Sequence, residues 1–376
     1  MPSDFLPILD ALPERKSPLM ERFWSLLEVK SPSQLEAMAR EARAITRRNF
    51  GRTMRMFAPL YVSNECVNNC SYCGFSRDNA SIMRVTLTIE QVVKEAQHLV
   101  AQGFRNILLV AGEHPKFVSD GYLEECIRAI REFVPTIGIE VGPMEAPEYE
   151  LMVKAGSEGL VVYQETYDRV IYADMHTAGP KKDFEWRMAC PERGYEGGFR
   201  RIGIGALFGL SDWRLEALRL AAHLEHLYKH CWKASFTVAF PRLRPAAGGF
   251  APMTGFPDWA LVQTIAAFRI VFPEVGIVLS TREPAPLRDA LAPLGITVMS
   301  AGSHTEPGGY TGAGSEDLHQ TVKGRRVELT TKDESAKAEG QFGIADERSP
   351  AEVAAMLKAQ GLDAVWKDWD PAILAA

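Results

Sequence analysis

The sequence predicts an α/β protein built as a (β/α)8, TIM-like barrel, and three observations lead to this fold. Eight short runs of apolar and β-branched residues follow one another along the chain. Continuous apolar runs of this kind are typical of parallel strands that are covered on both faces. Most of the intervals between the runs can hold a helix. The length of 376 residues and the hydrophobic content of 46% fit one barrel with extensions at both ends.

The candidate strands are short, and turn residues or helical patterns separate them. If these segments close into a barrel, the residues that follow their carboxyl ends lie together at one face. Barrel enzymes have their active sites at that face. In chain order the expected strands are residues 56–64, 106–112, 137–142, 159–165, 201–209, 235–240, 276–282 and 296–302.

The helix expected between the first two strands shows the clearest pattern. Residues 88–102 carry apolar side chains at helical spacing. Thr88 and Gln91 form a capping-box pattern at the start of this segment, and Gly103 follows its end. The same kind of pattern predicts two further helices, at residues 215–228 and 259–272.

The barrel divides the chain into three parts. Residues 19–27 and 33–47 have helical patterns and precede the first strand. We therefore expect a helical extension, a barrel, and a C-terminal extension that packs on the barrel. The expected boundaries are residues 1–50, 51–305 and 306–376.

The C-terminal extension begins with a stretch that lacks a helical pattern. Residues 308–345 are rich in glycine, threonine and charge, which predicts an ordered loop region. Ser349 and the proline after it predict the start of a last helix, over residues 350–360. Trp366 and Trp369 lie close to the end of the chain, and we expect them to be packed down.

Composition and charge exclude several classes of function. The net charge of −6, from 42 basic and 48 acidic residues, argues against nucleic-acid binding, which needs a basic excess. The longest apolar stretches are too short to span a bilayer. The first residues hold acids and prolines where a signal peptide has a basic start and an apolar run. We expect a cytoplasmic protein with no nucleic-acid or membrane partner.

The cysteines fall into two groups. Cys66, Cys70 and Cys73 lie within eight residues, directly after the first expected strand. The other three lie singly among apolar or helical neighbours, where a thiol is most often a small buried hydrophobic group. They are Cys126, Cys190 and Cys231. Only the cluster needs a chemical explanation.

Three explanations compete for the cluster. A structural zinc site needs four ligands, and the nearest histidines in the sequence are His98 and His114. A disulfide is disfavoured in a reducing compartment. Three thiolates on an iron–sulfur cluster leave one iron free for a small chelating ligand, and this interpretation accounts best for the spacing.

The arrangement Cys-x3-Cys-x2-Cys, with Tyr72 just before the last cysteine, resembles the signature of the radical S-adenosylmethionine (SAM) superfamily. This resemblance implies a [4Fe-4S] cluster on Cys66, Cys70 and Cys73 and SAM as the second cofactor. In the superfamily the cluster cleaves SAM reductively, and the resulting 5′-deoxyadenosyl radical takes hydrogen from the substrate. The resemblance also implies a full or partial barrel, which agrees with the strands expected above.

Stretches outside the cysteine loop resemble one branch of the superfamily, the 2-iminoacetate synthase family of tyrosine lyases in thiamine biosynthesis. The match runs from about residue 50 to the C-terminus. A cysteine triplet alone identifies only the superfamily, whereas this series identifies the branch. The matching stretches are residues 60–64, 73–76, 112–115, 163–167, 202–213, 279–284, 300–303 and 365–369.

The resemblance implies a set of residues that bind SAM. Glu113 resembles the residue that receives the SAM amino group, which suits a charge-assisted hydrogen bond. Glu165 matches the position that binds the ribose hydroxyls, and Arg187 resembles the arginine that pairs with the SAM carboxylate. Tyr72 is expected beside the adenine.

The resemblance also implies a substrate site for L-tyrosine. Arg282, at the end of the seventh expected strand, can hold the tyrosine carboxylate with a planar, bidentate guanidinium, and Arg288 competes for this role. Ser303, with Ser300, is a plausible hydroxyl partner for the same carboxylate. The histidines expected nearest to this site are His114 and His304.

The resemblance implies that the radical takes a hydrogen atom from the tyrosine amino group and that the Cα–Cβ bond then breaks. The products implied are 2-iminoacetate and 4-cresol, with SAM converted to 5′-deoxyadenosine and methionine. The expected partners are thiazole synthase, which takes the labile imine, and a reductant such as flavodoxin or ferredoxin. Alternatives are a tryptophan lyase and a non-catalytic metal-binding module. The related tyrosine lyase of hydrogenase maturation holds a second cluster on C-terminal cysteines, whereas the last cysteine here is Cys231.

Overall fold

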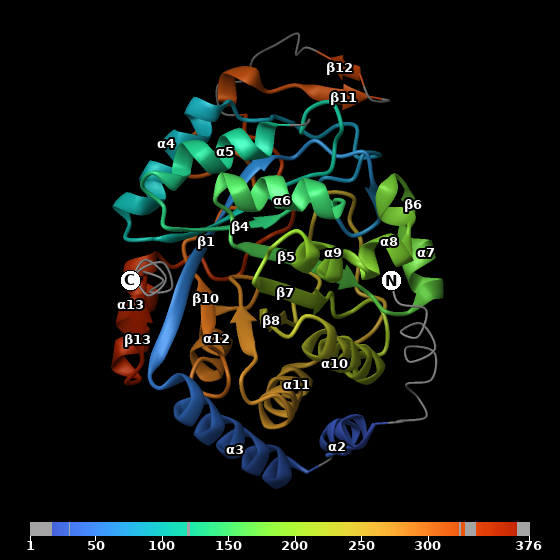
Figure 1. The fold of residues 1–376 in the computed structure, drawn as a ribbon, viewed down its shortest axis with the longest axis vertical. Helices are drawn as coiled ribbons and strands as arrows, with labels where there is room; N and C mark the ends of the chain where they lie inside the picture. Colours follow the sequence, from blue (N-terminus) through green and yellow to red (C-terminus); the bar gives the residue numbers. More distant parts are fainter. Residues whose placement is uncertain (1–16, 30, 119–120, 323–324, 328–335, 367–376) are drawn as a thin grey trace.

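The computed structural model describes residues 17–29, 31–118, 121–322, 325–327 and 336–366. Eight parallel strands form a ring, because each pairs with the next and the last, β10, pairs with the first, β1. Figure 1 shows these strands arranged around the centre of the view, with helices outside them. The predicted (β/α)8 barrel is therefore confirmed. Its strands are β1 (Thr53–Ser63), β3 (Asn106–Ala111), β4 (Thr136–Glu140), β5 (Gly159–Glu165), β7 (Arg201–Ala206), β8 (Ser235–Ala239), β9 (Gly276–Leu279) and β10 (Val298–Ser300).

All eight strands coincide with runs expected from the sequence, although several end earlier than predicted. The strand β9 stops at Leu279, so Arg282 lies three residues beyond it and not at its last position. Side chains of alternate residues point into the barrel, as the period of a strand requires. The outward-facing apolar side chains pack under the helices and form one continuous core.

The helices that surround the barrel confirm the predicted alternation. The helix α4 is capped as the sequence indicates, because Thr88 and Gln91 form both hydrogen bonds of a capping box. The connection between β5 and β7 is more complex than one helix. The helices between the strands are α4 (Ile89–Ala101), α5 (Tyr122–Arg131), α6 (Ala146–Ala155), α7 (Arg169–Met175), α8 (Phe184–Met188), α9 (Cys190–Glu196), α10 (Trp213–His230), α11 (Asp258–Val271) and α12 (Ala285–Leu291), with the 3-10 turn η2 (Pro180–Lys182).

The N-terminal extension contains the two predicted helices, α2 (Pro18–Leu27) and α3 (Pro32–Phe50). Both pack against α11 at the lower edge of Figure 1. The ring of Phe23 contacts that of Phe268 edge-on, with 4.9 Å between centroids. Gln263 of α11 donates a hydrogen bond to the Leu26 carbonyl at 2.7 Å. These contacts cover the outer face of α11.

Three short pairings outside the barrel were not predicted. The strand β2 (Asn69–Cys70), within the cysteine loop, pairs with β6 (His176–Ala178). The strands β11 (Gln320–Val322) and β12 (Arg325–Val327) form a hairpin in the region expected to be a loop. The strand β13 (Asp363–Val365) pairs with the start of β1. Two of these pairings, β2 with β6 and β13 with β1, join segments far apart in the sequence, where no local pattern marks them.

The C-terminal extension packs on the barrel as expected. Its helix α13 (Pro350–Ala359) begins at the predicted cap, Ser349. Trp366 lies edge-on to Phe104, with 5.1 Å between ring centroids; Trp369 lies outside the described residues. A 3-10 turn, η3 (Ser315–Asp317), lies in the loop region before the hairpin.

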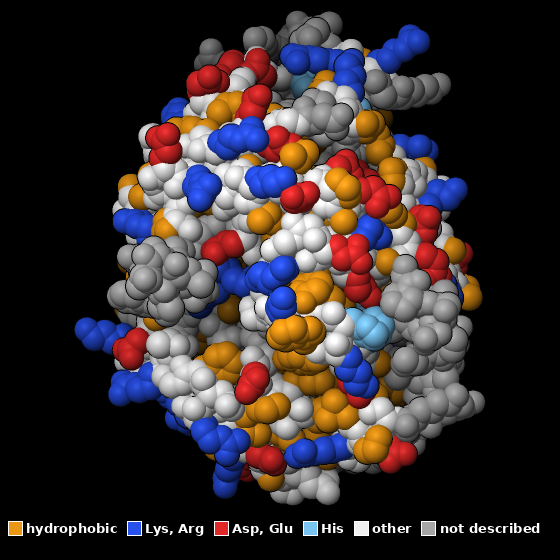
Figure 2. Space-filling model, viewed as in Figure 1, with side chains coloured by type: hydrophobic (Ala, Val, Ile, Leu, Met, Phe, Trp, Pro, Cys, Tyr) orange, Lys and Arg blue, Asp and Glu red, His pale blue; other side chains and the backbone are white. Residues whose placement is uncertain are grey.

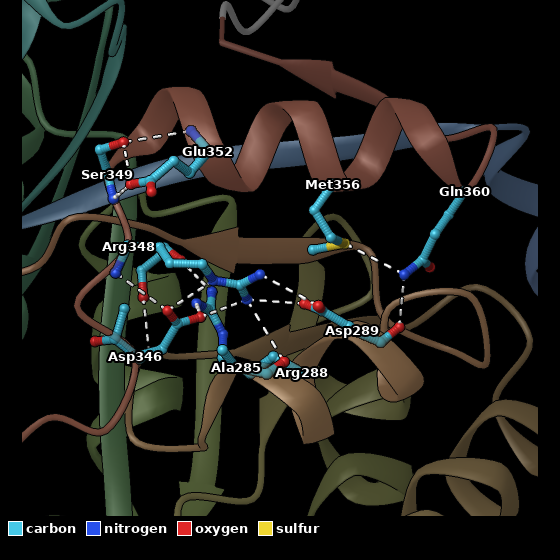
Figure 3. A network of polar contacts seen from close by, with 11 residues as sticks. Ala285, Arg288, Asp289, Asp346, Arg348, Ser349, Glu352, Met356 and Gln360 are labelled. Carbon is cyan, nitrogen blue, oxygen red and sulfur yellow. Dashed lines mark hydrogen bonds and ion pairs between the residues drawn. The ribbon is translucent and has the colours of Figure 1, made fainter.

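A buried ion pair fastens this extension to the barrel. The guanidinium of Arg288, on α12, is fully buried and pairs with Asp346. Asp346 also accepts hydrogen bonds from Arg348, which reaches Asp289 at 2.8 Å (Figure 3). Arg288 also donates to the backbone carbonyl of Ser300 at the end of β10. The network therefore joins α12, β10 and the segment before α13.

None of the helices in the described segments is long and apolar enough to cross a membrane. Figure 2 shows acidic and basic side chains distributed over the same face of the molecule.

The three single cysteines, Cys126, Cys190 and Cys231, are free and buried, as their apolar surroundings in the sequence indicate. The Sγ of Cys190 lies 2.8 Å from the Tyr149 hydroxyl.

Removing Asp346 should destabilise the protein strongly. In Asp346→Ala the Arg288 guanidinium remains buried without its counter-charge, which costs about 3–5 kcal/mol of unfolding free energy. Denaturant unfolding measures this loss. The control is Asp363→Ala, whose exposed carboxylate lies 3.9 Å from Arg52, and which should change stability by no more than about 0.5 kcal/mol. Equal effects of the two substitutions would contradict the role of the buried pair.

Candidate active site

The cysteine loop follows the carboxyl end of β1, on the face where barrels place their active sites. The antiparallel pairing of β2 with β6 holds the segment around Cys70. The Val67 N–H donates to the carbonyl of Glu113 at 2.8 Å, so the loop is also tied to the end of β3. The three clustered cysteines are free thiols; Cys70 is buried, and Cys66 and Cys73 are partly buried. The loop is thus fixed on two sides.

The thiols have the chemistry that a cluster site requires. Burial raises the pKa of each of them, that of Cys73 to about 11. Buried thiolates therefore need a cation, such as iron, to stabilise them. Among the described residues no three His, Cys, Asp or Glu side chains are close enough to hold one metal ion. In an iron–sulfur cluster the thiolates bind different iron atoms, so they do not have to converge on one point.

Glycine at position 112 allows the end of β3 to approach the cysteine loop closely. A Cβ atom at Gly112 would lie 2.2 Å from the carbonyl oxygen of Glu65 and 3.2 Å from the Cβ of Cys66. Since the first contact is with backbone, no other residue fits there without a shift. Gly112 thereby places Glu113, the next residue, beside the cysteine loop.

Asn68, inside the cysteine loop, connects two of the predicted SAM-binding residues. Its side-chain amide donates to Glu113 at 2.7 Å, and its amide oxygen accepts the backbone N–H of Lys181 at 2.9 Å. The ammonium group of Lys181 in turn lies 2.7 Å from Glu165. One chain of polar contacts therefore runs from Glu113 through the cysteine loop to Glu165.

Glu165 is the last residue of β5 and has an unusual backbone conformation. Its φ angle is 71°, and it is the one non-glycine residue with positive φ in the described part of the chain. The carboxylate pairs with Lys181 at 2.7 Å and with Arg187 at 3.5 Å. Burial acts to raise the pKa of the Glu165 carboxyl, but Lys181 and Arg187 outweigh it and hold that pKa below its ordinary value. The structure thus brings Glu165 and Arg187 together, and it adds Lys181.

Lys181 is a residue of this site that the sequence does not indicate. It lies in the turn η2 between two short elements, and nothing in the local sequence distinguishes it from Lys182. Its ammonium group also lies 5.6 Å from the centroid of the Tyr72 ring. The Tyr72 hydroxyl forms a 2.6 Å hydrogen bond with the ring of His176. Burial, then the charge of Lys181, lowers the pKa of His176 to about 3, so this ring is neutral.

The predicted substrate residues line one cavity of about 90 Å³ above the barrel interior. Arg282 lies over the ring of Phe342, with 3.3 Å from its guanidinium carbon to the centroid. The Ser303 hydroxyl is buried and has no hydrogen-bond partner among the described residues. A cation and an unpartnered hydroxyl therefore face the same space, which suits a carboxylate. Other residues that line the cavity are Tyr61, Glu140, Tyr163, Phe240, Ser300 and Gln341.

The structure separates the two candidate arginines. Arg288 is committed to Asp346 and to the carbonyl of Ser300, and it does not line this cavity. The two histidines considered from the sequence do not line it either. His304 pairs with Glu306 at 3.0 Å, and the Nδ1 of His114 accepts the backbone N–H of Lys116 at 3.2 Å. Of the two candidate arginines, Arg282 is the one that lines the cavity.

Several lining residues were absent from the sequence analysis. Glu140 is the last residue of β4, so the argument from strand ends could have found it. Gln341 and Phe342 come from the C-terminal extension, about 280 residues along the chain from Tyr61, to whose hydroxyl Gln341 is bonded at 2.8 Å. No sequence pattern indicates that this part of the C-terminal extension reaches the cavity.

Comparison with known proteins identifies the family. Residues 60–221 match the Radical SAM superfamily, and residues 239–363 match the Biotin and Thiamin Synthesis associated domain. The chain is 42% identical to 2-iminoacetate synthase of Escherichia coli (strain K12), over 92% of this chain and 86% of that protein. The chain belongs to the 2-iminoacetate synthase family. Enzymes of its superfamily use a [4Fe-4S] cluster and SAM, as the cysteine motif predicts.

Further similar proteins support the same family membership. The Salmonella typhimurium 2-iminoacetate synthase is 41% identical over the same share of both chains. The crystal structure of HydG, a maturase of the [FeFe]-hydrogenase, superposes with a TM-score of 0.83 at 30% identity, covering 97% of this chain and 76% of that one. Methylornithine synthase (PylB) superposes with a TM-score of 0.71 at 20% identity, over 95% of this chain and 97% of that one, and shows the common fold.

The cysteine substitutions should separate the cluster ligands from the buried thiols. Anaerobically reconstituted protein should hold about four irons. Cys66→Ala, Cys70→Ala or Cys73→Ala should lose the cluster absorbance and SAM cleavage, as iron analysis and product chromatography measure. Cys126→Ala, Cys190→Ala and Cys231→Ala should keep both. Full iron content and normal SAM cleavage in Cys70→Ala would show that the ligands lie elsewhere.

Proposed function

We propose that this protein is a radical SAM lyase that cleaves the Cα–Cβ bond of L-tyrosine to 2-iminoacetate and 4-cresol for thiamine thiazole synthesis. The membership of the 2-iminoacetate synthase family supports this reaction. The observation that carries it in the structure is the shared cavity of Arg282 and Ser303, which lies close enough to Glu165 for that charge to act on Arg282. An amino acid bound there by its carboxylate lies beside the SAM-binding residues.

When bound, the cluster and SAM supply a one-electron cleavage that gives methionine and 5′-deoxyadenosine and removes one hydrogen atom from the substrate. Cys66, Cys70 and Cys73 hold the cluster. Glu113 receives the SAM amino group, and Arg187 receives its carboxylate. Glu165, kept ionised by Lys181, accepts hydrogen bonds from the ribose hydroxyls, and Tyr72 lies beside the adenine. The charges are in place before SAM arrives, so binding it needs little reorganisation.

The residues of the substrate cavity fix tyrosine and exclude water. Arg282 presents a planar guanidinium whose orientation is set by Phe342 beneath it. The Ser303 hydroxyl gains the partner that it lacks in the structure by donating to the same carboxylate. The aromatic walls of the cavity suit the phenol ring of tyrosine. Since Gln341 and Phe342 belong to residues 306–376, this extension completes a site whose other walls belong to the barrel of residues 51–305.

The chemistry of the product supports the proposed partners. An imine of glyoxylate hydrolyses readily in water, so direct transfer to thiazole synthase protects it. The cluster needs an electron for each turnover, and a flavodoxin or ferredoxin can supply it. Six free thiols suit the reducing conditions of the cytoplasm, which we propose as the location.

The choice of substrate should distinguish a tyrosine lyase from a tryptophan lyase. With SAM and dithionite under anaerobic conditions, tyrosine should give 4-cresol and 5′-deoxyadenosine in equal amounts by mass spectrometry. Tryptophan should give little or no 3-methylindole, as the membership of the 2-iminoacetate synthase family implies. Equal turnover of tryptophan would instead make the protein a tryptophan lyase. SAM cleavage without any amino-acid product would contradict both.

Arg282 should be required for tyrosine binding, and a lysine should not replace it. Arg282→Ala leaves the buried tyrosine carboxylate without a cation, which costs about 3–5 kcal/mol, or a hundredfold or more in affinity. Arg282→Lys keeps the charge but loses the planar fork, so it should fail nearly as badly. Both variants should cleave SAM slowly without tyrosine, and Arg200→Lys, at the opposite end of the barrel, is the control. Normal tyrosine affinity in Arg282→Ala, measured by calorimetry, would exclude this role.

A further inference from the structure

Glu140 is a carboxylate of the substrate cavity to which no role has been given above. It is the last residue of β4 and lines the same cavity as Arg282 and Ser303. In the part of the chain that the structure describes, its carboxylate forms no hydrogen bond and no ion pair. Glu165, at the end of the neighbouring strand β5, is held by two cations. Glu140 is therefore the acid of this site that is available to a ligand.

The charged groups that act on Glu140 belong to both parts of the site. They are Glu165, Arg187 and Lys181, in β5, α8 and η2, and Arg282, which follows β9. The phenol groups of Tyr61 and Tyr163, on β1 and β5, are close enough to feel its charge. Glu140 thus lies where the SAM-binding residues meet the substrate-binding residues.

The chemistry of an amino acid explains what a carboxylate would do there. Free tyrosine at neutral pH is a zwitterion, and Arg282 can satisfy only its carboxylate. An ammonium group taken from water into a closed cavity needs an anionic partner. Burial and the charge of Glu165 raise the pKa of Glu140 to about 7, so it is a better proton acceptor than an ordinary glutamate. Desolvation and the nearby cations lower the pKa of the bound ammonium group.

We propose that Glu140 binds the α-ammonium group of the substrate and accepts one of its protons. The inference rests on the proposed tyrosine lyase function. In this step one N–H bond breaks, an O–H bond forms on the Glu140 carboxyl, and the electron pair stays on nitrogen. No oxidant, reductant or further reactant is needed. The neutral amine then presents, next to the SAM-binding residues, the hydrogen that the reaction removes.

The test compares ligands that differ in one group. Calorimetry on the holoenzyme with SAM, without reductant, measures binding of tyrosine, of 3-(4-hydroxyphenyl)propanoate, which lacks the amine, and of phenylalanine, which lacks the phenol hydroxyl. The wild type should prefer tyrosine to the amine-free analogue by about a hundredfold. Glu140→Gln should lose this preference and keep the preference for tyrosine over phenylalanine. Loss of the second preference instead of the first would overturn the proposal and assign Glu140 to the phenol.

Turnover and its pH dependence give a second measurement. The proposed proton transfer requires the ionised carboxylate of Glu140. The kcat/KM for 4-cresol formation in the wild type should therefore fall as pH decreases through about 7, where Glu140 becomes protonated. Glu140→Gln should lower kcat by about 10²–10⁴-fold and lose this acid limb.

Two variants distinguish this role from a structural one. Glu140→Asp keeps a carboxylate and should recover part of the amine preference, whereas a purely structural glutamate would show no such recovery in ligand choice. Glu158→Gln, at the opposite end of the barrel, should behave as wild type. A Glu140→Gln protein with normal amine preference and normal kcat overturns the inference. The absence of 4-cresol from the wild type would overturn the proposed function itself. The binding comparison would still show whether Glu140 binds the amine of the ligand.

Discussion

The ion pairs of Glu165 with Lys181 and Arg187 are the interaction on which the rest of the site depends. A non-glycine residue with a φ of 71° costs about 1–3 kcal/mol and persists only where its surroundings enforce it. Here two cations hold the side chain, and the Leu207 N–H donates to its carbonyl at 2.7 Å. Through Lys181 and Asn68 the same contacts reach Glu113 and the cysteine loop. The proposed cluster ligands and the acids proposed to bind SAM are therefore positioned together.

Two glutamates at the ends of neighbouring strands receive opposite properties from their surroundings. Cations beside Glu165 hold its pKa low, so it stays ionised and accepts hydrogen bonds. Glu140 lacks such pairing, and burial together with the charge of Glu165 raises its pKa to about 7. One carboxylate is thus suited to hold a cofactor and the other to exchange a proton. Arg282 lines the same cavity as Glu140 and completes a set of charges that matches a zwitterion.

The barrel and the cysteine motif could be predicted because both depend on local pattern. Apolar runs mark the eight strands, and the spacing of Cys66, Cys70 and Cys73 is contained in one loop. The choice between Arg282 and Arg288 could not be made from sequence, because it depends on Asp346, an acid 58 residues away that pairs with Arg288 in the core. Lys181 and Phe342 were missed for the same reason: tertiary contacts alone bring them to the site.

The central claim is that the amine of tyrosine faces the SAM-binding residues when its carboxylate is held by Arg282. An isotope experiment tests this arrangement directly. In deuterium oxide, where the tyrosine amine exchanges its hydrogens, the 5′-deoxyadenosine formed should contain deuterium by mass spectrometry. With tyrosine deuterated at Cα and Cβ in ordinary water, it should contain none. Deuterium transfer from carbon in the second experiment, with none in the first, would contradict the account.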